Sequence, residues 1–238
     1  MFSIIIPVLQ PNPLLFRCVD SITNQKDISP AQIIVVYKKA NKSLLSKIKN
    51  KLKKHNLIYI HQKKEGIYNA MNLGINKATR TFVLFLGEDD ALNCSKTLQQ
   101  LKKEITKNKK YNIYYGDVLI DSKKRFISNN DMLWIRNRIH HQGIAYERKI
   151  FHKYGGYNES YRLFSDYDFL LRINKKKCSF KKTNVIFSKS ASQGRSGMPS
   201  LQNLREVIGI RNKHFSFPYN YLGNALSIVS YVVRKVKH

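Results

Sequence analysis

The sequence predicts an α/β fold with a mixed, mostly parallel central sheet flanked by helices. Short apolar runs alternate with helix-like segments over residues 2–86, which is typical of a sheet covered on both faces. Hydrophobic residues make up 42% of the 238 residues, enough for one sizeable core. No Pro-rich or Ser-rich linker interrupts the pattern. We therefore expect one domain over 1–215, followed by a helical extension over 216–238.

The first part of the chain predicts the element order βαβαβαβ. Apolar, β-branched runs give the expected strands, at 2–8, 32–37, 57–61 and 82–86. The segments between them give the expected helices, within 11–25, at 43–55 and at 67–78. Ligands of such sheets bind beyond the carboxyl ends of the strands. Pro7, Tyr37 and the run 87–90 end three strands, so we expect them to converge on one crevice.

The second part of the chain predicts a mixed continuation of the same domain. Further strands are expected at 111–121, 125–127, 144–147 and 185–188. Further helices are expected at 95–108 and 165–174.

The last segment, 221–238, predicts an amphipathic helix with a basic end. Its apolar residues repeat at helical spacing, at Leu222, Leu226, Val229, Val233 and Val236, and the basic end is 234–237. A helix of this kind lies in an anionic membrane interface or docks on its own domain, and the sequence leaves both open.

The charge balance predicts an anionic partner. The chain carries 43 Lys+Arg against 15 Asp+Glu, a formal net charge of +28. Nucleic acid, an anionic membrane surface and phosphorylated substrates all fit such a charge. The basic residues are scattered over the whole chain, without a recognition helix or an aromatic sheet motif. We therefore expect no nucleic-acid partner and favour the other two.

The sequence also predicts a reducing compartment. Cys18, Cys94 and Cys178 are far apart and lack metal-ligand spacing, so we expect free thiols. The start of the chain has no basic leader, and Pro7 ends its apolar run, so we expect a buried strand there rather than a signal peptide. No apolar stretch reaches the roughly 20 residues that span a bilayer. We expect a cytoplasmic protein, peripheral on the inner face of the cell membrane.

A short acidic run follows the fourth expected strand. It reads Gly87-Glu88-Asp89-Asp90 in a chain that is otherwise rich in Lys and Arg. Carboxylates this close repel one another, and a hard cation such as Mg²⁺ or Mn²⁺ that also bridges phosphate oxygens would neutralise them. A solvated acidic turn is the alternative.

A second acidic pattern lies at the start of the expected helix 165–174. Ser165 and Asp168 have the spacing of a capping box, which gives Asp168 a structural role. Asp166 has no such role, and in the first helical turn it could accept a proton from a substrate hydroxyl. A helix-end charge is the alternative.

Three further segments carry polar candidates. His140 and His141 are adjacent and should point to different sides, so we expect at most one of them to face a given pocket. Asn72, in the block 65–74, could bond a ribose or cap a helix. Arg195 lies in a Gly- and Ser-containing segment that could close over a diphosphate or form a surface turn.

In order and spacing, these segments resemble the family 2 glycosyltransferases of the GT-A fold, and most closely the bacterial group that builds surface polysaccharides and lipopolysaccharide. The resemblance covers roughly residues 2–190. The matching segments are 3–8, 65–74, 85–90, 141–142, 154–159 and 165–172.

This resemblance implies an inverting transfer from a nucleotide diphosphate-sugar, usually a UDP-sugar, to a hydroxyl of a lipid-linked or lipopolysaccharide-core saccharide, as in lipopolysaccharide, O-antigen or capsule biosynthesis. It implies that Asp166 is the catalytic base and that Mn²⁺ or Mg²⁺ is the cofactor. The implied metal ligands are Asp89 and Asp90. The implied donor contacts are Pro7, Glu65, Asn72, Asp89 and Arg195. The implied acceptor contacts are His141 and Gln142.

The chain departs from the family pattern at three positions. Tyr37-Lys38-Lys39 stands where the family usually has an acidic residue that reads uracil, and Gly87 replaces the first acid of the metal motif. Ser165 replaces a Glu that often precedes the base. Gly87 and the missing acid near Tyr37 keep open a catalytically silent sugar- or nucleotide-binding relative. The net charge of +28 and the fourteen tyrosines keep open a basic nucleic-acid-binding protein as a further alternative.

Overall fold

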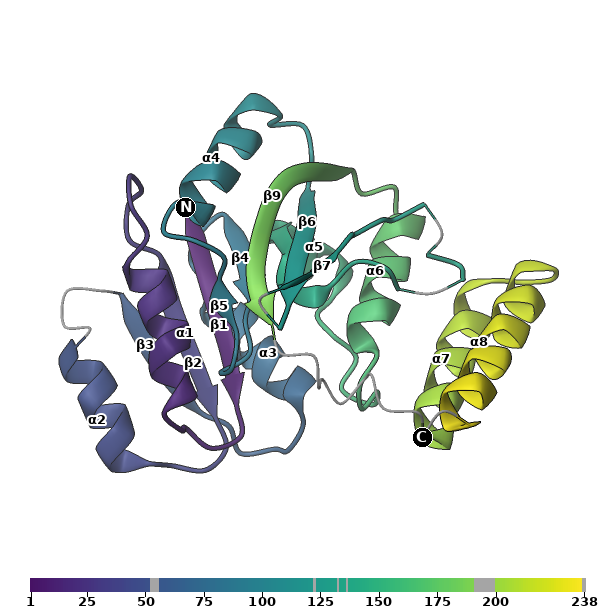
Figure 1. The fold of residues 1–238 in the computed structure, drawn as a ribbon, viewed down its shortest axis with the longest axis horizontal. Coiled ribbons are helices and arrows are strands. Elements are labelled where there is room, and N and C mark those ends of the chain that lie inside the picture. The colour runs from purple at the N-terminus through teal and green to yellow at the C-terminus, as the bar shows by residue number, and fades with distance from the viewer. Residues whose placement is uncertain (52–55, 122, 132, 136, 191–199, 237–238) are drawn as a thin grey trace.

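The computed structural model describes residues 1–51, 56–121, 123–131, 133–135, 137–190 and 200–236. Within these residues nine strands join in one sheet, in the order β3-β2-β1-β4-β8-β6-β9-β5, with β7 beside β6 (Figure 1). The strands are β1 (Phe2–Val8), β2 (Gln32–Tyr37), β3 (Leu57–His61), β4 (Phe82–Phe85), β5 (Ala91–Leu92), β6 (Ile113–Ile120), β7 (Lys124–Phe126), β8 (Ile144–Glu147) and β9 (Phe180–Ser190). The helices are α1 (Leu14–Thr23), α2 (Lys42–Lys51), α3 (Ile67–Lys77), α4 (Thr97–Lys107), the 3₁₀ turn η1 (His141–Gly143), α5 (Lys149–Tyr154), α6 (Ser165–Lys175), α7 (Leu201–His214) and α8 (Tyr219–Val236).

Strands β1 to β4 form a block of parallel strands. β1 pairs in parallel with β2 and β4, and β2 pairs in parallel with β3. β8 runs antiparallel to both β4 and β6, whereas β9 runs parallel to β6. The predicted mixed α/β architecture is confirmed, and the order βαβαβαβ holds through β4.

Two apolar cores cover the two faces of the sheet, because successive side chains of a strand point to opposite faces. Ile4 and Ile6 of β1 pack with buried residues of α1, α2 and α4. Ile5, between them, packs with buried residues of α3, α5 and α6. Burial on both faces explains why these strands are continuous apolar runs in the sequence.

The sequence does not predict α5 and α7, and it predicts only residues 185–188 of β9. The first half of β9 contains Lys181 and Lys182, which give it no apolar alternation, and its pairing with β6 forms the strand instead. Helix α7 buries the polar side chains of Arg211 and His214, so its inward face carries only a weak apolar pattern.

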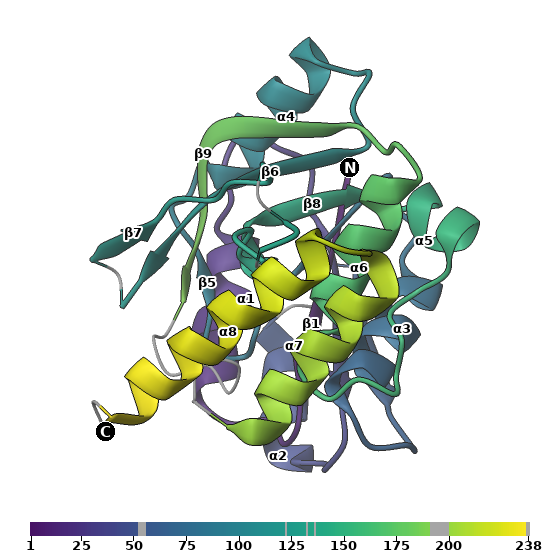
Figure 2. The ribbon, with the colours of Figure 1, turned by 90° about the vertical axis from the view of Figure 1, so that its right-hand side faces the viewer.

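Helices α7 and α8 pack against each other on the side of the molecule away from α2 and β3 (Figures 1 and 2). Arg211 of α7 is fully buried between them. Its guanidinium donates to the backbone oxygen of Trp134 at 2.9 Å, to Asn224 at 2.7 Å and to Ser227 at 3.0 Å. It also donates to the backbone oxygen of Ile135. Arg211 thus joins α7, α8 and the segment 134–135.

Helix α8 packs through its small and polar side. Gly223 is buried, and Asn224 and Ser227 contact α7. The predicted apolar stripe faces outward, with Leu222 53% and Val229 60% exposed. The stripe therefore does not pack on the described part of its own domain, and that alternative is wrong.

None of the described helices combines the length and hydropathy needed to cross a bilayer. All three cysteines are free, as predicted.

Candidate functional site

A cleft of about 1590 Å³ lies at the carboxyl ends of β1, β2 and β4. Its opposite wall includes Val207 of α7 and Ser230 and Arg234 of α8. The cleft therefore lies where parallel sheets usually bind their ligands. It brings together seven of the predicted site residues, namely Pro7, Glu65, Asp89, Asp90, His141, Gln142 and Asp166.

Asp166 lines this cleft from the first turn of α6. The hydroxyl of Tyr68, in α3, donates to its Oδ1 at 3.2 Å. The side-chain amide of Asn137 donates to its Oδ2 at 3.3 Å. Two neutral donors thus orient the carboxylate without neutralising it.

The environment of Asp166 makes it a better base than an ordinary carboxylate. Burial raises the pKa of Asp166 from 3.8 to about 6, and hydrogen bonds from the Tyr167 backbone and from Tyr68 offset part of that rise. The negative charge of Glu206 raises the same pKa further. A carboxylate with this pKa is ionised near neutral pH and still binds a proton readily.

The N-terminus of α6 is not held by the predicted capping box. The N-cap position of α6 is occupied by Phe164, and no side chain there accepts a capping hydrogen bond. The Ser165 hydroxyl has no hydrogen-bond partner among the described residues. Asp168 is buried and accepts hydrogen bonds from His214 at 2.9 Å and Lys213 at 3.2 Å. These contacts hold the pKa of Asp168 below its ordinary value, although burial opposes them. Asp168 is therefore structural through α7 rather than through Ser165.

Glu206 of α7 holds the backbone that leads into α6. Its carboxylate accepts the backbone N–H groups of Arg162 at 3.1 Å, Leu163 at 2.9 Å and Phe164 at 2.8 Å. An acidic side chain at a helix N-terminus satisfies N–H groups that have no partner within the helix. Glu206 thereby fixes the segment that presents Asp166.

The acidic run 87–90 is ordered by hydrogen bonds of Asp90. Asp90 is 2% exposed, and its Oδ2 accepts the backbone N–H of Gly87 at 2.5 Å. Its Oδ1 accepts the hydroxyl of Ser190, at the end of β9. Burial raises the pKa of Asp90, and these two hydrogen bonds offset part of the rise. Asp90 therefore anchors the loop, whereas Asp89 is partly exposed at the cleft.

The carboxylates of Asp89 and Asp90 meet beside Gly87. A Cβ atom at Gly87 would lie 2.8 Å from Oδ1 of Asp89 and 2.9 Å from Oδ2 of Asp90. The described part of the chain holds no group of three or more His, Cys, Asp or Glu that could bind a metal by itself. Mg²⁺ is usually bound by one or two carboxylates plus substrate phosphates, and Mn²⁺ prefers the same oxygen ligands. Two converging carboxylates fit such a cation when a diphosphate supplies further ligands.

His140 and His141 both line the cleft, so the expectation that at most one faces a pocket is wrong. His140 is extended, and the turn η1 begins at His141, so the pair does not follow the alternation of a regular strand. The His141 ring stacks on Phe85 with 5.3 Å between ring centroids. Burial lowers the pKa of His141 to about 3 and also lowers that of His140. Both rings are therefore neutral near pH 7 and suit hydrogen bonding to uncharged hydroxyl groups.

One predicted donor contact, Asn72, lies away from the cleft, and another, Arg195, cannot be placed. Asn72 does not line the cleft, and Tyr157 and Glu159 hold its side-chain amide instead. It donates to the Tyr157 oxygen and accepts the Tyr157 N–H, each at 2.9 Å. Asn72 therefore ties α3 to the segment 157–159. Arg195 lies outside the described residues. At the end of β2, Lys38 and Lys39 line the cleft, and Tyr37 does not.

The sequence model of glycosyl transferase family 2 matches residues 3–170, which include the cleft-lining residues from Pro7 to Asp166. The chain belongs to this family. A Mycobacterium tuberculosis protein named "PGL/p-HBAD biosynthesis glycosyltransferase" is 35% identical over 176 residues, which cover 72% of this chain and 69% of the relative. An uncharacterized glycosyltransferase of Rickettsia bellii is 32% identical over 100 residues, 42% of this chain and 14% of that protein. The chain is a glycosyltransferase.

Solved structures share the fold of this family 2 member. S. aureus TarS 1-349 in complex with UDP-GlcNAc aligns with a TM-score of 0.70 at 14% identity, over 88% of this chain and 65% of that chain. The alignment with a longer TarS chain covers 91% of this chain and 44% of that chain. The mannosyltransferase PcManGT from Pyrobaculum calidifontis, in complex with GDP-Man and Mn²⁺, aligns with a TM-score of 0.70 at 14% identity, over 98% of this chain and 73% of that chain.

Three residues that position Asp166 in this glycosyltransferase are not predicted from the sequence, namely Tyr68, Asn137 and Glu206. Glu206 carries a usable signal, because it is the single acidic residue after Asp168 in a strongly basic stretch. Tyr68 and Asn137 carry none, since their distance from Asp166 in the sequence hides the contact.

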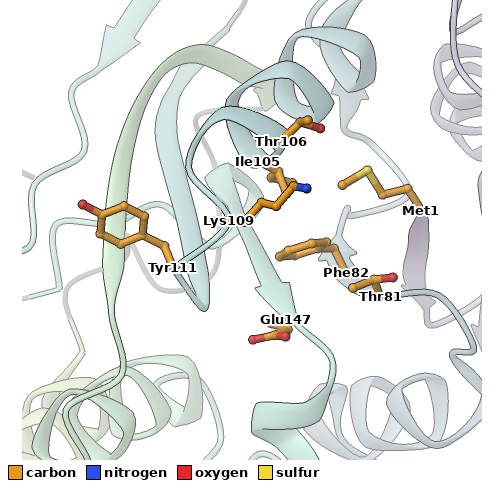
Figure 3. Close-up of a pocket in the computed structure, with 8 residues that line it drawn as sticks. All are labelled: Met1, Thr81, Phe82, Ile105, Thr106, Lys109, Tyr111 and Glu147. Carbon is orange, nitrogen blue, oxygen red and sulfur yellow. The ribbon is translucent and has the colours of Figure 1, made fainter.

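A second, smaller cavity of about 250 Å³ lies at the other edge of the sheet (Figure 3). Met1 and Phe82, which line it, stand at the amino ends of β1 and β4. Its carboxylate, Glu147, pairs with Lys149 at 2.8 Å and accepts the Asn112 amide at 2.8 Å. The predicted catalytic and binding residues do not line this cavity, so the larger cleft is the candidate active site of the glycosyltransferase.

Proposed function

We propose that this glycosyltransferase moves a sugar from a nucleotide diphosphate donor, a UDP-sugar, to a hydroxyl of a saccharide acceptor with inversion at the anomeric carbon. The observation that carries the proposal is the oriented carboxylate of Asp166, with its raised pKa, in the same cleft as Asp89. A base for the acceptor and an acidic group for the donor side are the two parts that such a transfer needs.

In this mechanism Asp166 accepts the proton of the acceptor hydroxyl while the hydroxyl oxygen attacks the anomeric carbon. The bond from that carbon to the diphosphate oxygen breaks in the same displacement, so the configuration inverts without a covalent intermediate. The hydrogen bonds from Tyr68 and Asn137 hold both oxygens of Asp166 in place for this transfer. His141 and Gln142 contact the acceptor, as neutral hydrogen-bonding groups.

On the donor side, Asp89 is the leading ligand for Mn²⁺ or Mg²⁺, with Asp90 beside it. When bound, such a cation stabilises the negative charge that develops on the leaving diphosphate. Pro7 and Glu65 contact the donor from the ends of β1 and the β3–α3 connection. The first turn of α3 contains no acidic residue and also lines the cleft, which favours an anionic ligand.

The acceptor in this proposal is a lipid-linked or lipopolysaccharide-core saccharide, glycosylated at the cytoplasmic face of the membrane for lipopolysaccharide, O-antigen or capsule. The net charge of +28 supports an acceptor or membrane surface that bears phosphate groups. The mycobacterial relative, whose name places it in PGL/p-HBAD biosynthesis, supports a biosynthetic acceptor.

A thermal-shift panel of nucleotide sugars, with and without Mn²⁺, tests the donor. We expect UDP-sugars to raise the melting temperature in the presence of Mn²⁺, because a ligand that binds only the folded state stabilises it. The anomeric configuration of the product, measured by NMR, tests inversion.

A catalytically silent relative is the second candidate. It is favoured by Gly87, which supplies no third carboxylate, and by the engagement of both Asp90 oxygens in hydrogen bonds. Donor binding without transfer or donor hydrolysis in Mn²⁺ would support it. Tight, salt-dependent binding to nucleic acid with no response to nucleotide sugars would contradict both candidates.

A further inference from the structure

Helix α8 carries a continuous apolar surface that no described residue covers. Its outer face consists of exposed apolar side chains, namely Tyr221, Leu222, Leu226, Ile228, Val229, Val232 and Val233. Phe217, just before the helix, and Tyr219, in its first turn, extend this surface, and Phe217 is 78% exposed. Scattered exposed apolar residues are normal on a protein, but a contiguous apolar face marks an interaction site.

The orientation of α8 is fixed by its other side. With 3.6 residues per turn, Gly223, Asn224, Ser227 and Tyr231 share one side of the helix, opposite the outer face. Gly223 is buried against Arg211, and a Cβ atom there would lie 2.6 Å from the Arg211 Nε. Asn224 and Ser227 accept hydrogen bonds from the same guanidinium. The polar contacts therefore turn the apolar side chains outward.

The charged residues of α8, and those of α7 after Glu206, are all basic. From Val207 to the end of the sequence no Asp or Glu occurs, while Arg234 and Lys235 end the helix. Figure 2 shows this end of α8 extending beyond the neighbouring elements. Lys and Arg side chains near an anionic bilayer strengthen binding to it. An apolar helix face with a basic end and flanking aromatic residues matches a helix that lies in the plane of a membrane interface.

A second copy of this chain is a poorer occupant. Two chains with a net charge of +28 each repel one another, and the basic end of α8 would face the like-charged partner. An anionic bilayer offers both an apolar layer for the outer face and negative charge for the chain.

The same helix also forms a wall of the candidate active site. Leu226, Ser230 and Arg234 line the cleft from α8. Leu226 belongs to both surfaces, so the cleft lies next to the outer face.

We propose that the outer face of α8 docks this protein on anionic lipid bilayers, with the cleft held beside the membrane surface. The docking proposal is supported by the exposed apolar face of α8 and by the basic charge of the chain. Its purpose, to present the cleft to a lipid-anchored acceptor, rests on the function proposed above.

Vesicle co-sedimentation of the full chain tests the docking. The probes are vesicles of phosphatidylcholine alone and of phosphatidylcholine mixed with phosphatidylglycerol. The test variant combines Leu222→Ser, Val229→Ser and Val233→Ser. We expect the wild type to bind the mixed vesicles and this variant to bind them at least tenfold more weakly, since it lacks three apolar side chains that docking would bury in the bilayer.

A matched variant separates this face from general charge attraction. Leu14→Ser, Ile127→Ser and Leu201→Ser change three side chains of similar exposure on other surfaces and leave the net charge unchanged. We expect this control to bind mixed vesicles as the wild type does. Equal binding by both triple variants would overturn the proposal, because charge alone would then account for attachment.

The single tryptophan provides an independent reading of orientation. Trp134 lies beside α8, with its ring centroid 5.4 Å from that of Tyr219. Brominated lipids in the mixed vesicles should quench its fluorescence in the wild type and much less in the α8 variant. Absence of quenching in sedimented wild-type protein would show attachment through another surface and overturn the proposal.

Two further readouts keep the alternatives apart. Light scattering that shows a wild-type dimer dispersed by the α8 variant would assign the face to a second copy and overturn the proposal. Transfer to a soluble acceptor should be equal in the wild type and the α8 variant. Loss of transfer in both would count against the proposed function and leave the docking result intact.

Discussion

The carboxylate of Glu206, in α7, accepts the backbone N–H of Phe164, the residue that caps α6, at 2.8 Å. Phe164 lies two residues before Asp166 in the sequence. One side chain from outside the family-matched residues 3–170 therefore holds the helix end that carries the candidate base. The position and the pKa of Asp166 depend on α7 as well as on its own helix.

Replacing Glu206 tests this dependence. Glu206→Gln keeps an oxygen acceptor but removes the charge that strengthens three hydrogen bonds, so we expect a loss of about 1–3 kcal/mol in the free energy of unfolding. The variant should also lower the pKa of Asp166, because the Glu206 charge raises it. The acid limb of the rate–pH profile should then move to lower pH. An unchanged limb together with lowered stability would restrict Glu206 to a structural role.

Asp166→Asn tests the base directly. Asn keeps the size of the side chain and cannot accept the proton, so we expect turnover to fall by about 10²–10⁴ while donor binding stays within a factor of two or so. Donor affinity by calorimetry and turnover by product release check the two parts. Asp27→Asn, an exposed carboxylate outside the cleft, serves as the control and should keep wild-type turnover. Transfer at near wild-type rate in Asp166→Asn would remove Asp166 from this role.

The raised pKa of Asp166 predicts a pH dependence of rate. The base acts in its ionised form, and its pKa is about 6. Below that value each pH unit should lower kcat/KM about tenfold, and above it the rate should level off. Tyr68→Phe removes a hydrogen bond that lowers this pKa, so its acid limb should lie at higher pH. A limb near the ordinary value of 3.8 in the wild type would contradict the assignment.

The same shift predicts a pH-dependent gain in stability for Asp166→Asn. The pKa of Asp166 is higher in the folded state than in the unfolded state, so the unfolded state releases this proton first as pH rises. The folded state of the wild type therefore loses up to about 3 kcal/mol between pH ~4 and ~6, and no more above that range. The substituted asparagine carries no charge, so the variant should melt higher than the wild type near neutral pH and similarly near pH ~4.

The two aspartates of the acidic run should respond differently to substitution. Asp89→Asn removes a partly exposed carboxylate, so we expect little change in melting temperature and a loss of the Mn²⁺-dependent part of donor binding. Asp90→Asn weakens the contacts to Gly87 and Ser190, so we expect a loss of about 1–3 kcal/mol in stability without any ligand. Calorimetric titration of a UDP-sugar with Mn²⁺ and with EDTA checks the first variant, and thermal melting checks the second. Equal donor affinity with Mn²⁺ and EDTA in the wild type would contradict a metal at this site.

The sequence predicts best what is encoded over short distances. The bounds of β1, β2, β3 and β8 are confirmed, because each is a local apolar run. Asp89 and Asp90 of the acidic run reach the cleft as predicted, because the carboxyl ends of parallel strands meet at one edge. Asp166 reaches the same cleft from the first turn of α6.

Long-range hydrogen bonds explain what the sequence does not predict. Ser165 and Asp168 have the spacing of a capping box, but Glu206, from another helix, satisfies the neighbouring N–H groups instead. Asn72 looks like a ligand contact by its place in the family block, yet Tyr157 occupies both ends of its amide. In each case the partner lies tens of residues away, beyond any local pattern.

The buried guanidinium of Arg211 couples the local unfolding of α8 to that of the segment 134–135 in the cleft wall. The guanidinium donates to the backbone oxygens of Trp134 and Ile135 and to the side chains of Asn224 and Ser227. Unfolding of either α8 or the segment 134–135 would therefore leave buried N–H groups of Arg211 without an acceptor. We expect amide hydrogens of α8 and of the α7 segment around Arg211 to exchange as a single cooperative unit rather than by fraying from the end. Anything that clamps α8 from outside would then slow exchange around Ile135 as well, inside the cleft.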